Sequence, residues 1–303
     1  MAVLREIIRN KYLYVLAVPG LLFLLIFAYL PMTGYLIAFK KYRLADGIWG
    51  SEWVGFDNFK FFFMGSDWYK VTFNTIFLNG LFIVCGLGIA LLLAILLNEV
   101  RLFIFKKIAQ TFIFMPYFIS WLVVSMMAFA FLNTTDGMLN RTLASYGMQG
   151  ENWYLMPEIW PAVLTIIYVW KFAGYYSIIF LAAIAGISGE YYESARIDGA
   201  SRLQQMIHIT LPLIRNVLIV LALLGVGRIF YGDFGMIYGI IGDNAPLYPT
   251  TDVIDTYSFR ALRQLGDFSK SSAVILYQAV MGLVTIILFN AIAKKIDKDS
   301  GLF

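Results

Sequence analysis

The chain has little charge and few of the residues that most catalytic and metal sites require. Only 14% of its 303 residues are charged, against about 25% in soluble domains, while 60% are hydrophobic. It contains one cysteine, Cys85, and one histidine, His208. A single cysteine excludes an internal disulfide and a paired-thiolate zinc site, and one histidine leaves little from which to build a catalytic constellation. The composition therefore predicts a polytopic membrane protein that is not an enzyme and holds no metal.

Two kinds of ligand-binding machinery are also missing from the sequence. The net charge is only +4 and the basic residues are scattered, so nothing favours binding of nucleic acid. A phosphate-binding P-loop needs the pattern GxxxxGK[ST], and "GDFSKSS" from Gly266 lacks the second glycine and the Gly-Lys pair. We expect no cofactor in this chain, so any ATP and Mg must be bound by a partner.

Long apolar runs make up most of the sequence. A helix that crosses a hydrocarbon core about 30 Å thick needs about 20 predominantly apolar residues. Six runs qualify and predict one all-α transmembrane domain over residues 1–303. The predicted spans are 14–39, 74–97, 108–132, 160–187, 213–241 and 273–293. The first run is too long for the apolar core of a signal peptide, so we interpret it as a retained helix surrounded by membrane lipid.

The distribution of cations predicts the topology. Six spans place both termini on one side, and the short second loop carries Arg101, Lys106 and Lys107 against two helix ends. Because Lys and Arg are enriched in short cytoplasmic loops, this loop and both termini are predicted to be cytoplasmic. The loops 40–73, 133–159 and 242–272 are then extracytoplasmic, and the polar segment 188–212 is cytoplasmic.

The segment 188–212 is predicted to fold as a bent pair of short helices. Asp198-Gly199 supplies the break, since glycine adopts the left-handed conformation that commonly ends a helix. Ser201 with Gln204 forms a capping box that starts the second helix. Pro212 follows where the next span begins, a position at which its missing N–H costs little. A loop lying in the lipid headgroups is the alternative that the pattern alone leaves open.

The same segment resembles the EAA loop of ABC importer permeases. "ESARIDGASRLQQMIHITLP" follows the family's pattern of Glu-Ala-Ala, three residues, Gly and then Ile-x-Leu-Pro, with Ser194 in place of the first alanine. Nearly the whole chain is similar to carbohydrate permeases of the maltose-transporter type, and especially to the LplB-like polysaccharide-permease subfamily. "WVGFDNFKFF" and "VWKFAGYYSIIFLAAIAGI" are among the stretches that carry this similarity.

This resemblance implies a type I ABC importer permease in a bacterial plasma membrane. Such a permease works with a second homologous permease, two ATPase subunits and an extracellular solute-binding protein that delivers an oligosaccharide. The EAA loop of the family docks in a groove of the ATPase, which implies ATPase-coupling roles for residues of the loop. These residues are Glu193, Ala195, Arg196, Asp198, Gly199 and Arg202.

Polar residues within the spans mark a candidate substrate path. A lysine that faces lipid at mid-membrane costs about 2.5 to 3.5 kcal/mol, so Lys171 must face protein or water. Arg228 and Asp233 lie in "GVGRIFYGDFGMIYG", whose glycines permit close packing or an irregular turn that lines a cavity. Tyrosines suit sugars, because their rings stack and their hydroxyls form hydrogen bonds. The predicted path residues are Lys171, Tyr168, Tyr175, Arg228, Tyr231, Asp233 and Tyr238.

A purely structural role for these residues remains an equal alternative. Lys171 would then pair with another subunit as part of the scaffold, and Arg228 and Asp233 would neutralise one another. If the cations are available to substrate instead, Lys171 with Arg228 suits an anionic, uronate-containing oligosaccharide.

The loop before the last span predicts a short helix from Asp252 to Leu265. The family resemblance implies that this loop approaches the ligand cleft of the binding protein. The candidate contacts are Asp252, Asp255, Tyr257 and Arg260. An ordinary interfacial helix is the alternative.

A transporter of another class is the main rival hypothesis. A secondary sugar carrier driven by an ion gradient would show paired acidic residues at mid-membrane or discontinuous helices in two inverted halves. Asp233 is the only acid well inside a predicted span, and no inverted repeat is evident in the sequence.

Overall fold

Helices form most of the computed structural model, which describes residues 6, 9–65 and 67–296. Short 3₁₀ and π segments, labelled η, connect or extend the α-helices. In order, the elements are α2 (Lys11–Leu24), η1 (Leu25–Tyr29), η2 (Leu30–Phe39), β1 (Lys40–Lys41), α3 (Gly47–Gly50), β2 (Glu52–Trp53), α4 (Asp57–Phe63), α5 (Asp67–Glu99), α6 (Phe103–Phe114), η3 (Met115–Phe118), α7 (Trp121–Leu132), α8 (Met138–Ser145), η4 (Trp153–Leu155), η5 (Pro157–Ile159), α9 (Trp160–Ala185), α10 (Gly189–Ile197), α11 (Arg202–Gln205), η6 (Met206–Thr210), α12 (Leu211–Val226), α13 (Phe234–Ile241), η7 (Ala245–Leu247), α14 (Tyr248–Thr251), α15 (Ile254–Leu265) and α16 (Phe268–Ile296).

Five helical stretches among the described residues are long and apolar enough to cross a membrane. They are Lys11–Phe39, Asp67–Glu99, Pro157–Ala185, Arg202–Val226 and Phe268–Lys295. Phe103–Phe118 and Trp121–Leu132 form a sixth apolar stretch that is bent by 98°. The predicted all-α membrane fold is therefore confirmed. The cytoplasmic location of the termini stays a prediction, since length and composition of the helices do not show which side of a membrane each end faces.

Two of the predicted spans are interrupted. The third bends after η3, where Ile119 is extended and the Ser120 side chain accepts a hydrogen bond from the N–H of Val123 to cap α7. The fifth ends as a regular helix at Val226, and tight turns lead to Asp233, which caps α13. A hydropathy pattern does not register either break, because the apolar residues continue through both.

Each of two prolines inside a helical stretch follows a π-helical segment. Pro31 is the second residue after η1, and Pro212 is the second residue after η6. A proline ring clashes with the carbonyl four residues earlier, and in both cases that carbonyl lies in the wider π turn. The helix therefore runs from Arg202 to Val226 without the boundary that the sequence predicts near Pro212.

The chain divides into two compact units, and the larger one contains Ser66–Tyr257 and Gln278–Phe303. Its long helices α5 and α9 pack against one another along much of their length. Small residues permit this approach: Ala90 and Ala94 are fully buried, and a Cβ on Gly86 would lie 3.1 Å from the Tyr168 ring. Two buried apolar clusters result, one around Phe82, Trp160 and α13 and the other around Phe180 and Ile214.

The smaller unit comprises residues up to Gly65 together with Ser258–Tyr277. Its strands β1 and β2 form an antiparallel pair in which Lys40 faces Trp53. The Asn58 amide donates to the carbonyls of Ala38 and Lys40, at 2.8 and 2.9 Å, and so fixes α4 against β1. The N–H of Tyr42 donates to the Ser269 hydroxyl at the start of α16.

Candidate functional site

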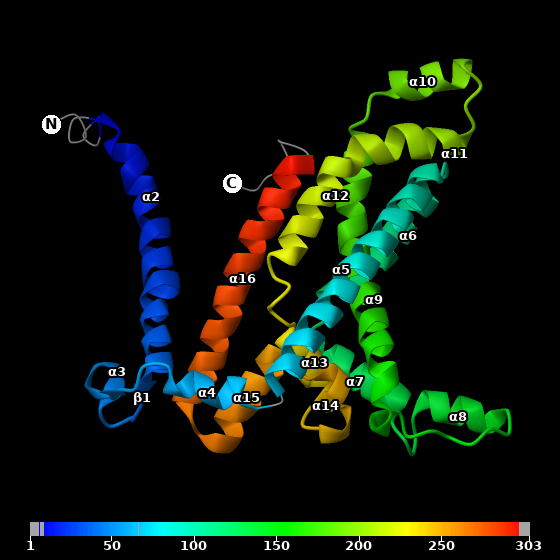
Figure 1. The fold of residues 1–303 in the computed structure, drawn as a ribbon. Coiled ribbons are helices and arrows are strands. Elements are labelled where there is room, and N and C mark those ends of the chain that lie inside the picture. The colour runs from blue at the N-terminus through cyan, green and yellow to red at the C-terminus, as the bar shows by residue number, and fades with distance from the viewer. Residues whose placement is uncertain (1–5, 7–8, 66, 297–303) are drawn as a thin grey trace. The chain divides into compact units, whose positions relative to one another are not determined.

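An elbow formed by α10 and α11 projects from the ends of α9 and α12 (Figure 1). Its bend is a Schellman motif: Ala200 N–H donates to the Ala195 carbonyl at 2.8 Å, and Gly199 N–H donates to the Arg196 carbonyl at 3.1 Å. Gly199 has φ +79°, so the left-handed turn predicted from Asp198-Gly199 is present. The predicted capping box is also confirmed, since Ser201 N–H donates to Gln204 Oε1 at 2.7 Å and Gln204 N–H to Ser201 Oγ at 3.3 Å.

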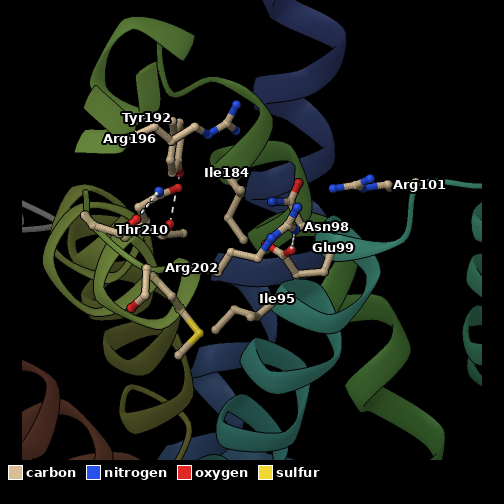
Figure 2. A pocket seen from close by; sticks show the side chains of 13 residues that line it. Ile95, Asn98, Glu99, Arg101, Ile184, Tyr192, Arg196, Arg202 and Thr210 are labelled. Atoms are coloured by element: carbon tan, nitrogen blue, oxygen red, sulfur yellow. Dashed lines mark hydrogen bonds and ion pairs between the residues drawn. The ribbon is translucent and has the colours of Figure 1, made fainter. Parts of the chain in front are cut away.

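Side-chain bonds hold the two limbs of the elbow together. The Tyr192 hydroxyl lies 2.9 Å from the Thr210 hydroxyl and joins α10 to η6. The buried Gln205 side chain donates to the Ala200 carbonyl at 2.9 Å. Arg202 forms an ion pair with Glu99 at the end of α5, which ties the elbow to a membrane-length helix (Figure 2). Relative motion of the elbow and α5 therefore requires the Arg202–Glu99 pair to move with them or to break.

The six predicted coupling residues differ in their exposure. Glu193, Asp198, Gly199 and the two arginines are exposed, while Ala195 is half-buried. Arg196 and Arg202 line a hollow of about 780 Å³ beneath the bend, together with Asn98, Glu99 and Arg101 from the α5 end (Figure 2). Arg202 has an intramolecular partner, whereas Glu193 and Asp198 leave two carboxylates on the outer surface of the elbow.

A second cavity, of about 540 Å³, lies among α5, α9 and α12. Five of the seven predicted path residues line it. These are Tyr168, Tyr175, Arg228, Tyr231 and Asp233. Phe82, Phe172 and Tyr176 add further rings, and Tyr168 stacks on Phe82 with ring centroids 4.8 Å apart. The structure thus brings together aromatic faces, hydroxyl groups, one cation and one carboxylate.

The break between α12 and α13 forms part of this cavity's wall. Side chains from neighbouring helices bind its free backbone groups: Asn79 donates to the Ile229 carbonyl at 3.0 Å, and Gln278 donates to the Phe230 carbonyl at 2.7 Å. Asp255 accepts from Gly232 N–H at 2.6 Å. Irregular backbone at membrane depth requires such internal partners. The cavity-lining turn permitted by the glycines is therefore present, and three polar side chains fix it in place.

Lys171 does not line the cavity. Its side chain is buried, and its ammonium donates to the carbonyls of Tyr117 and Ile119, and to that of Pro116 at 3.4 Å. These carbonyls belong to the end of η3, where no further helical turn follows to bind them. A positive charge at a helix C-terminus also complements the helix dipole. Lys171 therefore stabilises the bend between η3 and α7.

Asp233 and Tyr238 also have protein partners. The Asp233 carboxylate accepts from the Trp121 indole at 2.7 Å and from Met236 N–H at 3.2 Å. No ion pair joins it to Arg228 among the residues that the structure describes. The Tyr238 hydroxyl lies outside the cavity lining and donates to Asp243 at 3.4 Å.

The four predicted contacts with a binding protein lie on or just before α15, which begins at Ile254 rather than at the predicted Asp252. Asp252 is buried and accepts from the Thr256 hydroxyl at 2.7 Å. Burial raises the pKa of the Asp255 carboxyl above its ordinary value, an effect opposed by hydrogen bonds from Gln278 and Gly232. Tyr257 and Arg260 are half-buried and also have interaction partners. Asp252 therefore bonds within the loop, whereas Asp255 joins the loop to the break before α13 and to α16.

Several functional side chains were not predicted from the sequence. Trp121, Asn79 and Gln278 hold the cavity wall, and Glu99 anchors the elbow. Asn79 and Gln278 could have been found as isolated amides in apolar runs, because Asn or Gln within a membrane helix needs a hydrogen-bond partner. The identity of that partner depends on helix packing.

A set of membrane-length helices with a polar cavity and a helical elbow defines a helical membrane permease. The chain belongs to the family described as binding-protein-dependent transport system inner membrane components, whose sequence model matches residues 86–298. It is 41% identical to Protein LplB of Bacillus subtilis (strain 168) over 97% of this chain and 92% of that protein. It is 39% identical to the polygalacturonan/rhamnogalacturonan transport system permease protein YteP of the same organism, over 97% of this chain and 91% of YteP.

Solved structures show the same fold over nearly the whole length. A chain of a bacterial ABC transporter involved in the import of the acidic polysaccharide alginate superposes with a TM-score of 0.89 at 32% identity, covering 98% of this chain and all of that one. A second structure, a bacterial alginate transporter in complex with alginate pentasaccharide-bound periplasmic protein, gives a TM-score of 0.87 at 33% identity over 97% and 98% of the two chains. The type I permease fold implied by the EAA resemblance is thereby confirmed.

Proposed function

We propose that this chain is one permease subunit of an ATP-driven importer of oligosaccharides in a bacterial plasma membrane. The observation that carries the proposal is the cavity of about 540 Å³ lined by four tyrosines, Arg228 and Asp233 among three apolar helices. Aromatic faces with hydroxyl and charged groups suit a sugar chain. The relatives support this substrate class, because one is named for polygalacturonan and rhamnogalacturonan and another for alginate.

The path is proposed to need partners on both sides of the membrane. An extracellular solute-binding protein delivers the oligosaccharide, as the alginate complex with its periplasmic protein suggests by similarity. A second homologous permease completes the path, and two ATPase subunits bind ATP and Mg. Among the described residues no group of acidic, histidine or cysteine side chains is arranged to hold a metal ion.

The elbow is proposed to be the surface that docks on the ATPase, with segment 188–212 and both termini in the cytoplasm. A partner's ATP cycle moves the permease only if the ATPase binds its two conformations with different free energies. The Arg202–Glu99 ion pair and the Tyr192–Thr210 bond connect the elbow to α5 and η6. Glu193, Asp198 and Gly199 supply the outer surface, and Tyr257 and Arg260 are the proposed contacts with the binding protein.

ATP hydrolysis by the complete purified complex tests this function. We expect substrate-loaded binding protein to stimulate hydrolysis, and we expect Gly199→Asp to abolish that stimulation in complexes that still assemble. Stimulation that survives Gly199→Asp would contradict the coupling role of the elbow. Uptake that needs an ion gradient but no ATP would instead support a secondary carrier.

A further inference from the structure

The two charged side chains that line the cavity differ in the hydrogen-bond partners that the protein gives them. Among the described residues that line it, Arg228 and Asp233 are the only basic and the only acidic side chain. They are five residues apart on the same irregular segment and close enough to interact electrostatically. Two such groups would ordinarily pair and leave the cavity neutral, but the structure shows no ion pair between them within the described chain.

Two donors orient the Asp233 carboxylate. Its Oδ2 accepts from Trp121 Nε1 at 2.7 Å, and its Oδ1 accepts from Met236 N–H at 3.2 Å. Trp121 is itself fixed: the Lys171 ammonium lies 5.0 Å from its ring centroid, and a Cβ on Gly235 would lie 3.1 Å from its Cδ1. Both carboxylate oxygens are therefore engaged by a rigid part of the protein.

Arg228 has a fixed backbone and an available head group. Its N–H donates to the Gly225 carbonyl at 3.0 Å and its carbonyl accepts from Tyr231 N–H at 2.8 Å. The next two carbonyls, of Ile229 and Phe230, are held by Asn79 and Gln278. The side chain is exposed in the cavity lining, and no hydrogen bond or ion pair engages it in the part of the chain that the structure describes.

Lys171 is not a second cation of this cavity. Its three carbonyl acceptors lie at the end of η3, and the side chain is only 5% exposed. An anionic substrate in the cavity therefore meets one guanidinium group. A guanidinium presents paired N–H donors that match a carboxylate in a bidentate arrangement.

We propose that Arg228 binds the carboxylate of an acidic sugar unit and that Trp121 is a positioning residue that keeps Asp233 from pairing with it. This rests on the proposed function, and it narrows the substrate class to oligosaccharides that carry carboxylates. The tyrosine rings beside Arg228 bind the sugar faces, and the guanidinium distinguishes an acidic unit from a neutral one.

Direct binding to the permease complex in lipid nanodiscs, without binding protein, tests the proposal. The two probes are trigalacturonate and its fully methyl-esterified form, which has the same sugar chain without the charges. Wild type is expected to bind the acid about tenfold to a hundredfold more tightly, the range for a charged hydrogen-bonded contact. Arg228→Gln is expected to bind both probes equally, and Arg141→Gln, at an exposed position on α8, serves as the matched control that keeps the preference.

The role of Trp121 is tested by epistasis. Trp121→Phe keeps an aromatic ring but loses the N–H, so Asp233 is released to pair with Arg228 and acid binding weakens while ester binding does not. Adding Asp233→Asn to Trp121→Phe removes the competing charge and is expected to restore acid binding. A preference for the acid that persists in Arg228→Gln overturns the proposal. So does a double variant that binds the acid no more tightly than Trp121→Phe does. Failure of the wild type to bind either probe also overturns it.

Transport measurements separate failure of this proposal from failure of the proposed function. Equal ATP-dependent uptake of acid and ester by the wild-type complex would leave the importer function intact and overturn the role of Arg228. Absence of uptake for every oligosaccharide would overturn both.

Discussion

Gly199 is the position where a single methyl group should perturb the elbow most selectively. Its φ of +79° lies in the left-handed region, where a side chain costs about 1–2 kcal/mol. A Cβ built on Gly199 meets nothing within 4 Å, so this conformational strain is the whole effect of Gly199→Ala. A change of that size shifts a local opening equilibrium about 5- to 30-fold.

Hydrogen exchange of the elbow amides measures this shift. The N–H groups of Gly199 and Ala200 close the Schellman motif, and that of Gln204 closes the capping box. In Gly199→Ala we expect these amides to exchange about 5- to 30-fold faster, because they exchange through local opening.

Gly189 provides the matched control. It begins α10, has no positive φ, and also has open space around its Cβ position. Gly189→Ala should leave exchange at the bend unchanged or slow it slightly, since alanine favours a helix over glycine. Equal exchange rates in the two variants would refute the assignment of strain to Gly199.

Three other predictions concern stability; the first and third are checked by thermal unfolding of the purified permease and the second by hydrogen exchange. Gly174→Ala should destabilise by at least about 1–3 kcal/mol, because its Cβ would lie 2.0 Å from the Ile113 carbonyl oxygen, whereas Gly88→Ala on the open side of α5 should be tolerated. Ser201→Ala should cost about 0.5–2 kcal/mol by removing the helix cap, seen as faster exchange at α11 with little change elsewhere. Lys171→Met should cost at least about 1–3 kcal/mol, because part-buried carbonyls at the end of η3 lose their donor; an unchanged unfolding temperature would contradict that role.

Local chemistry explains which parts of the fold were predictable from the sequence. The elbow depends on residues within about a dozen positions of one another, so Gly199 and Ser201 were sufficient to predict its bend and second helix. The long apolar runs likewise predicted the membrane helices, since length and hydropathy decide whether a segment spans.

The interruptions and the cavity contacts depend on residues far apart in the chain. The bend after η3 is stabilised by Lys171, more than 50 residues later, and the break after α12 by Asn79, about 150 residues earlier. Hydropathy cannot show such pairs, because each polar residue is isolated in its own apolar run. The same limit explains why Trp121 was missed: only packing of α7 against α13 brings its indole to Asp233.

Several polar residues predicted to line the path or contact a binding protein have partners within the protein. Lys171 and Asp233 were predicted together as path residues, but both have protein partners, and only Asp233 lines the cavity. Asp252 accepts from Thr256 in its own loop, and Asp255 accepts from Gly232 N–H in the break before α13. For Arg228, by contrast, no ion pair is found within the described part of the chain.

The central claim, that this permease moves oligosaccharide by ATP-driven conformational change transmitted through the elbow, is tested most directly in proteoliposomes containing the whole complex. The measurement is uptake of labelled oligogalacturonate delivered by its binding protein, with ATP supplied on the elbow side. The account predicts uptake that requires ATP and is lost in Gly199→Asp complexes that retain their ATPase subunits. Uptake that proceeds without ATP, or that is unchanged in Gly199→Asp, would contradict it.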